Sequence, residues 1–88
     1  MEAVQQPDEP KSIHIGQIIE GELRRQERSV TWFSRKLHCD RRNVYDIFTR
    51  QFIDTELLLR ISIVLGVDFF SYFSTVYKAH RYDYLSPP

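Results

Sequence analysis

Four Ser or Asp residues, each standing where a segment of helical character can begin, divide this 88-residue chain into short segments. They are Ser29, Asp40, Asp54 and Asp68. Ser and Asp are favoured at helix N-caps because their side-chain oxygens accept hydrogen bonds from the unpaired amides of the first turn. We therefore predict four helices, over 30–37, 41–49, 55–65 and from 69 to about 77.

Apolar spacing supports this division and adds a helix before Ser29. A period of three and four residues begins at Ile13 and fades near Gln26, and it is carried by Ile15, Ile18, Ile19 and Leu23. Gly16 and Gly21 each weaken this helix by about 1 kcal/mol relative to alanine, which suggests close packing. The next two helices would turn inward Phe33, Ser34 and Leu37, and then Val44, Ile47 and Phe48.

Residues 57–65 are apolar on nearly every side, which fits either a buried strand or a buried helix. The Asp54 cap, the length and the stop at Gly66 favour a buried central helix. Residues 1–12 are polar and contain two prolines, so we expect a disordered arm. We expect an all-α domain over 13–77, a compact five-helix bundle, followed by a tail over 78–88.

The formal net charge is zero, yet the charges are unevenly placed. Residues 24–50 hold eight bases and three acids, a net of +5, whereas residues 1–23 hold one base and five acids. Such a basic middle third is typical of nucleic-acid binding. A single cysteine, Cys39, excludes a disulfide framework and fits a reducing compartment. With no signal peptide or membrane span in the sequence, we expect a cytoplasmic protein with no membrane partner.

The stretch 29–50, SVTWFSRKLHCDRRNVYDIFTR, joins two short helices by a tight turn. It resembles the helix-turn-helix of the lambda-repressor-like family, the phage repressor and Cro proteins with their xenobiotic-response-element relatives. The matching positions run on through the Leu-Gly-Val-Asp exit of the fourth helix, and they are Ser29, Phe33-Ser34, Leu37, His38-Cys39, Asp40, Val44, Ile47, Asp54-Thr55 and 65–68. The resemblance covers about residues 13–76 and implies a lambda-repressor-like bundle that binds DNA.

The chain departs from that family at several positions. The family often has glycine in the turn, where φ is positive, and this chain has His38, a residue type that tolerates that conformation. Glu27 stands for the usual glycine between the first two helices, and Val30 for a phosphate-binding glutamine. Phe48 and Arg50 replace a glutamate and a glycine. These changes leave the fold intact and alter the expected contacts with DNA.

The resemblance implies that the helix over 41–49 enters the major groove and reads bases with Arg41, Arg42, Asn43 and Asp46. Arginine can pair bidentately with guanine, asparagine with adenine, and aspartate can accept from cytosine. Phosphate contacts are expected from the amides at the start of the second helix and from flanking side chains: Ser29, Val30, Thr31, Arg35, Lys36, Tyr45, Arg50 and Gln51.

Simpler roles stand beside these. Arg41, Arg42 and Asn43 could be a solvated helix start, and Asp46 could pair with Arg42. Tyr45 and Trp32 fit half-buried packing at least as well as a backbone contact, and Cys39 fits a small buried hydrophobe.

The histidines and the cysteine show no metal-ligand spacing, and no catalytic constellation is visible. We therefore expect no enzyme, cofactor, metal or small-molecule substrate.

The C-terminal segment holds more aromatic residues than one helix can bury: Phe69, Phe70, Tyr72, Phe73, Tyr77, Tyr82 and Tyr84. Aromatic residues concentrate at interfaces, so a homodimer through the fifth helix and the tail is one expectation, and coverage of the chain's own core is the other.

Two functions remain open. The first is a sequence-specific transcriptional regulator that binds double-stranded DNA, and the second is an adaptor that keeps the fold and binds a protein.

Overall fold

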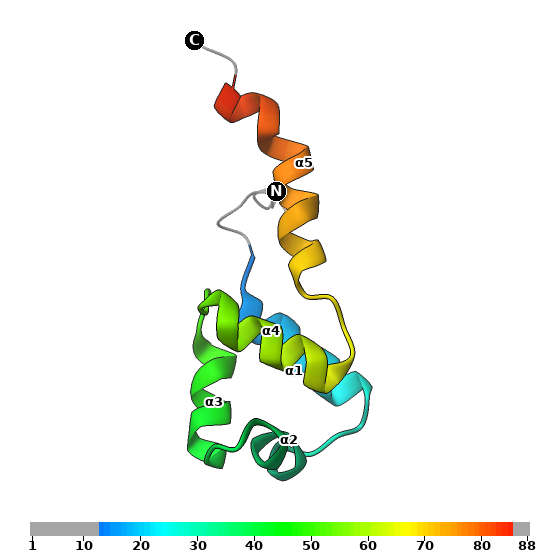
Figure 1. Ribbon diagram of the computed structural model, residues 1–88, viewed down its shortest axis with the longest axis vertical. Coiled ribbons are helices and arrows are strands. Elements are labelled where there is room, and N and C mark those ends of the chain that lie inside the picture. The colour runs from blue at the N-terminus through cyan, green and yellow to red at the C-terminus, as the bar shows by residue number, and fades with distance from the viewer. Residues whose placement is uncertain (1–12, 86–88) are drawn as a thin grey trace, which may run out of the picture. The chain divides into compact units, whose positions relative to one another are not determined.

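The computed structural model describes residues 13–85, and these contain helices and no strand. In chain order the helices are α1 (Ile15–Arg25), α2 (Val30–Leu37), α3 (Arg41–Thr49), α4 (Thr55–Leu65) and α5 (Phe70–Leu85) (Figure 1). The all-α prediction with five helices is confirmed for this part of the chain. The expected arm, 1–12, lies outside the described residues.

Two of the predicted N-caps form as expected. The Ser29 hydroxyl accepts from the Trp32 amide at 2.9 Å, and the Asp54 carboxylate accepts from the Leu57 amide at 2.8 Å. Asp40 stands at the cap position of α3 with extended backbone, but its side chain accepts no cap hydrogen bond, so that prediction is wrong in its chemistry. The carboxylate is exposed to solvent, which satisfies it without the helix amides.

Three helices end in the same way, with a residue of positive φ followed by a hydrogen bond back across five residues. These residues are Glu27 (φ 57°) after α1, His38 (φ 58°) after α2 and Gly66 (φ 69°) after α4. The amides of Arg28, Cys39 and Val67 donate to the carbonyls of Leu23, Ser34 and Ser62. This is the Schellman arrangement, usually completed by glycine. His38 therefore adopts the left-handed conformation predicted for the turn.

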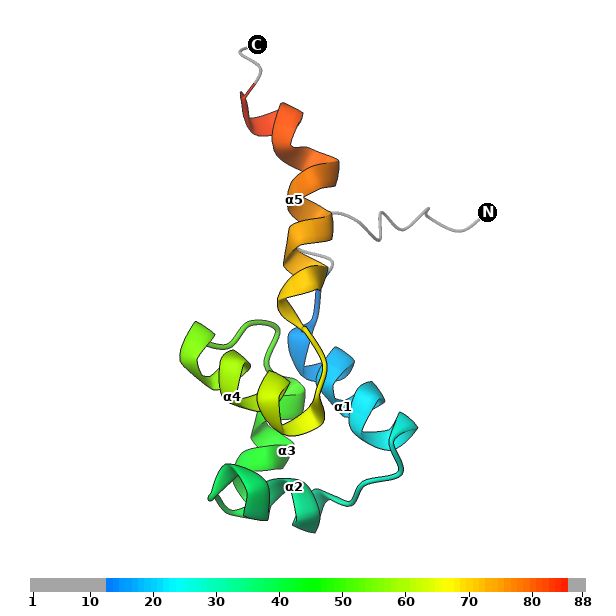
Figure 2. The same cartoon turned by 45° about the vertical axis from the view of Figure 1, so that its right-hand side comes forward.

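The unit 14–68 contains α1 to α4, and α3 packs against both α1 and α2 while α2 also contacts α4 (Figure 2). Its core includes the inward faces predicted for α2 and α3, all of which are buried. Gly16 lies buried where α1 meets the end of α3, and its amide donates to the Arg50 carbonyl at 2.9 Å. Gly16 thus marks close packing as expected. At Gly21, by contrast, an added Cβ would meet no atom within 4 Å, so the close packing expected there is absent.

The helix α4 is not buried on every side, which corrects the prediction. Leu58, Ile61 and Leu65 face the core, but Leu59 is 51% exposed and Ile63 is 70% exposed. Periodicity cannot show this, because apolar residues stand on both the covered and the uncovered faces.

The helix α5 also differs from its prediction, since it continues to Leu85 instead of ending near Tyr77. No glycine or proline interrupts residues 78–85, and lysine, alanine, arginine and leucine all favour helix. The side chains of Tyr82 and Tyr84 lie outside the described part, as do residues 86–88.

No single helix within the part searched, residues 13–81, is long and apolar enough to cross a membrane, although α4 and residues 70–81 of α5 meet those two criteria as a pair.

Candidate nucleic-acid interface

The four side chains expected to read bases all lie on the outer surface of α3. Arg41, Arg42, Asn43 and Asp46 are exposed. The opposite face, made by Val44, Ile47 and Phe48, is buried in the core. With 3.6 residues per turn, this one-sided burial leaves Arg41, Arg42 and Asn43 in the first turn of α3 accessible to a groove of DNA.

Some basic side chains of the described residues are neutralised by acids. On α1, Arg24 pairs with Glu20 at 2.6 Å and Arg25 pairs with Glu22. The Glu22 carboxylate also accepts from Gln26 at 2.7 Å. The bonds from Arg25 and then from Gln26 hold the pKa of Glu22 below its ordinary value of 4.5. The α1 surface therefore carries balanced charge.

Among the remaining bases, five that follow one another from the loop before α2 to the start of α3 lack such partners. Among the described side chains, residues 13–81, no carboxylate pairs with any of them: Arg28, Arg35, Lys36, Arg41 and Arg42. We call these five residues the basic face. All five are exposed. The positive charge that composition located in the middle third is thus uncompensated on α2 and α3.

Position along the helix separates the members of the basic face. Arg35 and Lys36 stand in the last turn of α2, where a cation stabilises the helix dipole. Arg41 and Arg42 stand in the first turn of α3, where a cation opposes the dipole. The second placement therefore has no stabilising role within the helix.

Asp46 pairs with Arg50 and not with Arg42. The Arg50 Nη2 lies 2.6 Å and its Nε 2.9 Å from the same Asp46 oxygen. An acid four residues before a base is the favoured order on a helix, because each charge then suits its end of the dipole. A side chain expected to read a base and one expected to bind phosphate are therefore tied to each other.

The start of α2 offers backbone donors. The Trp32 amide is capped by Ser29, while the amides of Val30 and Thr31 donate no hydrogen bond within the described residues. Unpaired amides at a helix N-terminus bind phosphate oxygens. Gln51, by contrast, lies exposed in the loop after α3, where its carbonyl accepts from the Ile15 amide at 2.9 Å.

Sequence reasoning missed a stack on the outer side of α2. The guanidinium of Arg28 lies 4.5 Å from the centre of the Trp32 ring, and the Lys36 ammonium lies 6.0 Å from it. Cations within about 6 Å of an indole ring are attracted to it. The signal was present as a spacing of four residues between each pair. Trp32 is half-buried as expected, and the stack orders two members of the basic face.

Half-buried packing, the role favoured for Tyr45, is wrong, because this side chain is mostly exposed. Its ring is 56% exposed and meets the Phe48 ring edge-on, with centroids 6.1 Å apart. One edge of Tyr45 is therefore anchored on the core while most of the ring remains accessible.

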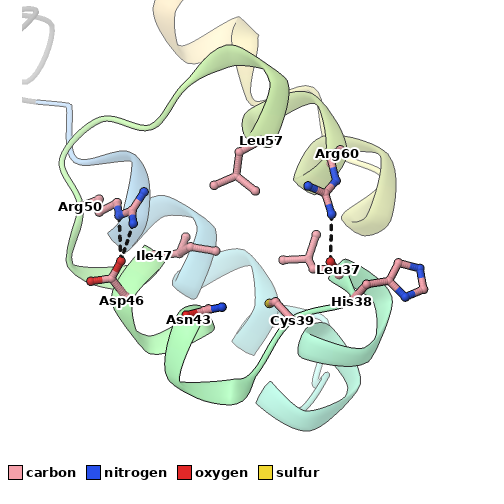
Figure 3. Close-up of a pocket in the computed structure, with 9 residues that line it drawn as sticks. All are labelled: Leu37, His38, Cys39, Asn43, Asp46, Ile47, Arg50, Leu57 and Arg60. Carbon is pink, nitrogen blue, oxygen red and sulfur yellow. Dashed lines mark hydrogen bonds and ion pairs between the residues drawn. The ribbon is translucent and has the colours of Figure 1, made fainter.

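A groove of about 350 Å³ lies between the end of α2, one side of α3 and the start of α4 (Figure 3). It is lined by Leu37, His38, Cys39, Asn43, Asp46, Ile47, Arg50, Leu57 and Arg60. Arg60 reaches across from α4 and donates to the Leu37 carbonyl at 2.9 Å, so it caps the end of α2.

Cys39, expected to be buried, is half-buried at the groove. Burial and, second, the nearby charge of Asp40 raise the pKa of its thiol above 9.0, while Arg60 acts in the opposite direction. The thiol is therefore protonated at neutral pH. The side chains of residues 13–81 include no cluster of three or more His, Cys, Asp or Glu placed to hold a metal ion.

No family model matches this chain, and no curated protein or solved structure matches it either.

Proposed function

We propose that this protein is a sequence-specific, double-stranded DNA-binding regulator of the lambda-repressor-like helix-turn-helix type. The first turn of α3 enters the major groove, and the start of α2 rests on the phosphate backbone. The observation that carries the proposal is the basic face: five exposed cations, from the loop before α2 to the first turn of α3, without carboxylate partners among the described side chains, whereas the arginines of α1 are paired.

The local geometry supports this assignment. The turn between α2 and α3 is three residues long and passes through left-handed His38, so the two helices change direction over a short distance. The exposed Arg41, Arg42 and Asn43 can then reach base edges while Arg35 and Lys36 reach phosphates. Phosphate contacts position such a protein, and base contacts specify its site.

We also propose that DNA is bound by a homodimer formed through α5. Tyr72 and Tyr77 of this helix are 42% and 63% exposed, and exposed aromatic side chains are enriched at interfaces. A two-fold dimer would present two copies of α3 to half-sites about 34 Å apart, one turn of DNA. Sedimentation should show a dimer that Tyr72→Ala/Tyr77→Ala weakens, and a monomer at high concentration would refute this part.

The regulator function is tested by selection from a random duplex library. Wild-type protein should enrich a repeated half-site, and Arg41→Ala/Arg42→Ala should lose that enrichment. The matched control is Arg24→Ala/Arg25→Ala, which removes the same charge from α1, where both arginines are paired. It should retain the wild-type site. Equal loss in both double variants, or no enrichment by the wild type, would contradict the proposal.

A protein-binding adaptor is the second candidate, and one observation favours it. Leu59 and Ile63 stand one turn apart on α4 and are largely exposed, as is Phe52 in the preceding loop. An adaptor of this kind would bind DNA weakly and without preference. The library selection separates the two functions, since only the regulator enriches a site.

A further inference from the structure

The groove between α2, α3 and α4 has the size of a small-molecule site. Its volume of about 350 Å³ falls within the range of about 300–1,000 Å³ that such sites occupy. Leu57 and the nearly buried Leu37 and Ile47 form the apolar part of the lining, and Asn43 and Arg60 bring polar groups to the same space (Figure 3). In such sites the apolar contacts bind a small ligand and the convergent polar groups orient it.

The charges that line the groove favour an anion. Asp46 and Arg50 neutralise each other across their ion pair. Arg60 is then the cation of the lining that has no carboxylate partner, because its one hydrogen bond goes to the neutral Leu37 carbonyl. A guanidinium has five N–H donors, so most of those on Arg60 are available to a carboxylate or phosphate. The side-chain amide of Asn43, also without a partner in the described residues, can hydrogen-bond the same ligand.

We propose that this groove binds a small organic anion, with its carboxylate or phosphate on Arg60 and Asn43 and its apolar body against Leu37, Ile47 and Leu57, and that this ligand regulates DNA binding. The regulatory half rests on the proposed function. Asn43 and Asp46 line the groove and are also assigned to base reading. A ligand that engages Asn43 withdraws it from the base edges, so ligand and DNA compete. Linkage then requires DNA to weaken the ligand by the same factor.

The site is tested first without DNA, by amide NMR titration of the full chain. The probe is benzoate, a carboxylate on an apolar ring, and its neutral counterpart is benzamide. Benzoate should shift amides of residues 37–39, 43–47 and 57–60 with a dissociation constant of about 1 mM or below. Benzamide and inorganic phosphate should each bind about tenfold more weakly, since one lacks the charge and the other the apolar body.

Three variants locate the anion. Arg60→Gln removes the charge and keeps a donor for the Leu37 carbonyl, and it should weaken benzoate about tenfold or more. Arg60→Lys keeps the charge and should retain most of the binding. Arg24→Gln, on the far surface of α1, should bind like the wild type. The amide spectrum of each variant reports directly that it is folded.

The proposed site would be overturned if benzoate shifted no amide signals of the groove residues, or if benzamide or inorganic phosphate bound as tightly as benzoate. It would also be overturned if Arg60→Gln bound benzoate as tightly as the wild type. In a second arm, benzoate should weaken DNA binding by the wild type more than sodium chloride of equal ionic strength does, and should have no such effect on Arg60→Gln. Benzoate binding by a protein that fails to bind DNA would uphold the site and refute the proposed function instead.

Discussion

Replacing Gly16 with alanine tests the contact that holds α1 against the end of α3. A Cβ at this position would stand 2.3 Å from the Ile47 carbonyl oxygen, 2.5 Å from that of Phe48 and 2.7 Å from that of Arg50. Ordinary contacts between carbon and oxygen lie at about 3.3–3.6 Å, so the overlap is about 1 Å. All three neighbours are backbone atoms and cannot rotate aside, so the two helices must separate.

The cost follows from what that separation breaks. The Ile15 amide donates to Gln51 and the Gly16 amide donates to Arg50, both at 2.9 Å, and each such bond contributes about 1 kcal/mol. Overpacking adds about 2 kcal/mol, and alanine returns about 1 kcal/mol through helix propensity. The net loss is about 3 kcal/mol, which lowers the melting temperature of a domain this size by about 12–24 °C.

Thermal unfolding followed by circular dichroism measures this loss. The matched control is Gly21→Ala on the same helix, where a Cβ meets no atom within 4 Å. That variant should gain about 1 kcal/mol and melt about 4–8 °C higher than the wild type. A Gly16→Ala protein that melts at or above the wild-type temperature would refute the reasoning.

Three further predictions concern single side chains. Ser29→Ala should lower the free energy of unfolding by about 1 kcal/mol, whereas Asp40→Ala should change it by about 0.5 kcal/mol or less, because Ser29 has a cap hydrogen bond and Asp40 has none; denaturant titration compares them. His38→Gly should raise the free energy of unfolding by about 0.5–1 kcal/mol, because glycine adopts a positive φ without the steric cost that histidine has. The melting temperature should therefore rise, and a lower melting temperature would contradict this. The hydrogen bond from Arg25 lowers the pKa of Glu22, so the contribution of this bond to stability is present above pH 4.5 and is lost as the pH falls through the folded-state pKa. In an acid titration the free energies of unfolding of the wild type and Glu22→Gln should therefore converge. A constant difference between them would argue against the bond.

Local chemistry made much of the fold predictable. The helix starts at Ser29 and Asp54 were predictable, because an N-cap depends only on residues within one turn. The helix end at His38 was predictable because histidine is among the few residue types that accept a positive φ. The inward faces of α2 and α3 followed from a clean helical period. The His14 cap of α1, in which the ring nitrogen Nδ1 accepts from Gln17 at 3.1 Å, escaped because histidine is not a common N-cap.

Features that depend on neighbours distant in sequence were not predictable. Leu59 and Ile63 match the core residues of α4 in type, and their exposure depends on which other helices pack there. The bond from Arg60 to Leu37 crosses from α4 to α2, so no spacing encodes it. The groove depends on the same juxtaposition. Of the candidate site, residue type and helix position could be predicted, whereas pairing could not: Asp46 had two possible basic partners.

The salt dependence of duplex DNA binding tests the central claim, that the basic face grips the phosphate backbone. When the logarithm of the binding constant is plotted against the logarithm of the salt concentration, the slope is about −0.9 for each phosphate that the protein neutralises. Wild-type protein should show a steep negative slope. The slope of Arg35→Ala/Lys36→Ala should be less negative by about 2, because two phosphate contacts are lost, whereas Arg24→Ala/Arg25→Ala should keep the wild-type slope. A flat slope for the wild type, or the same change in both double variants, would contradict the account.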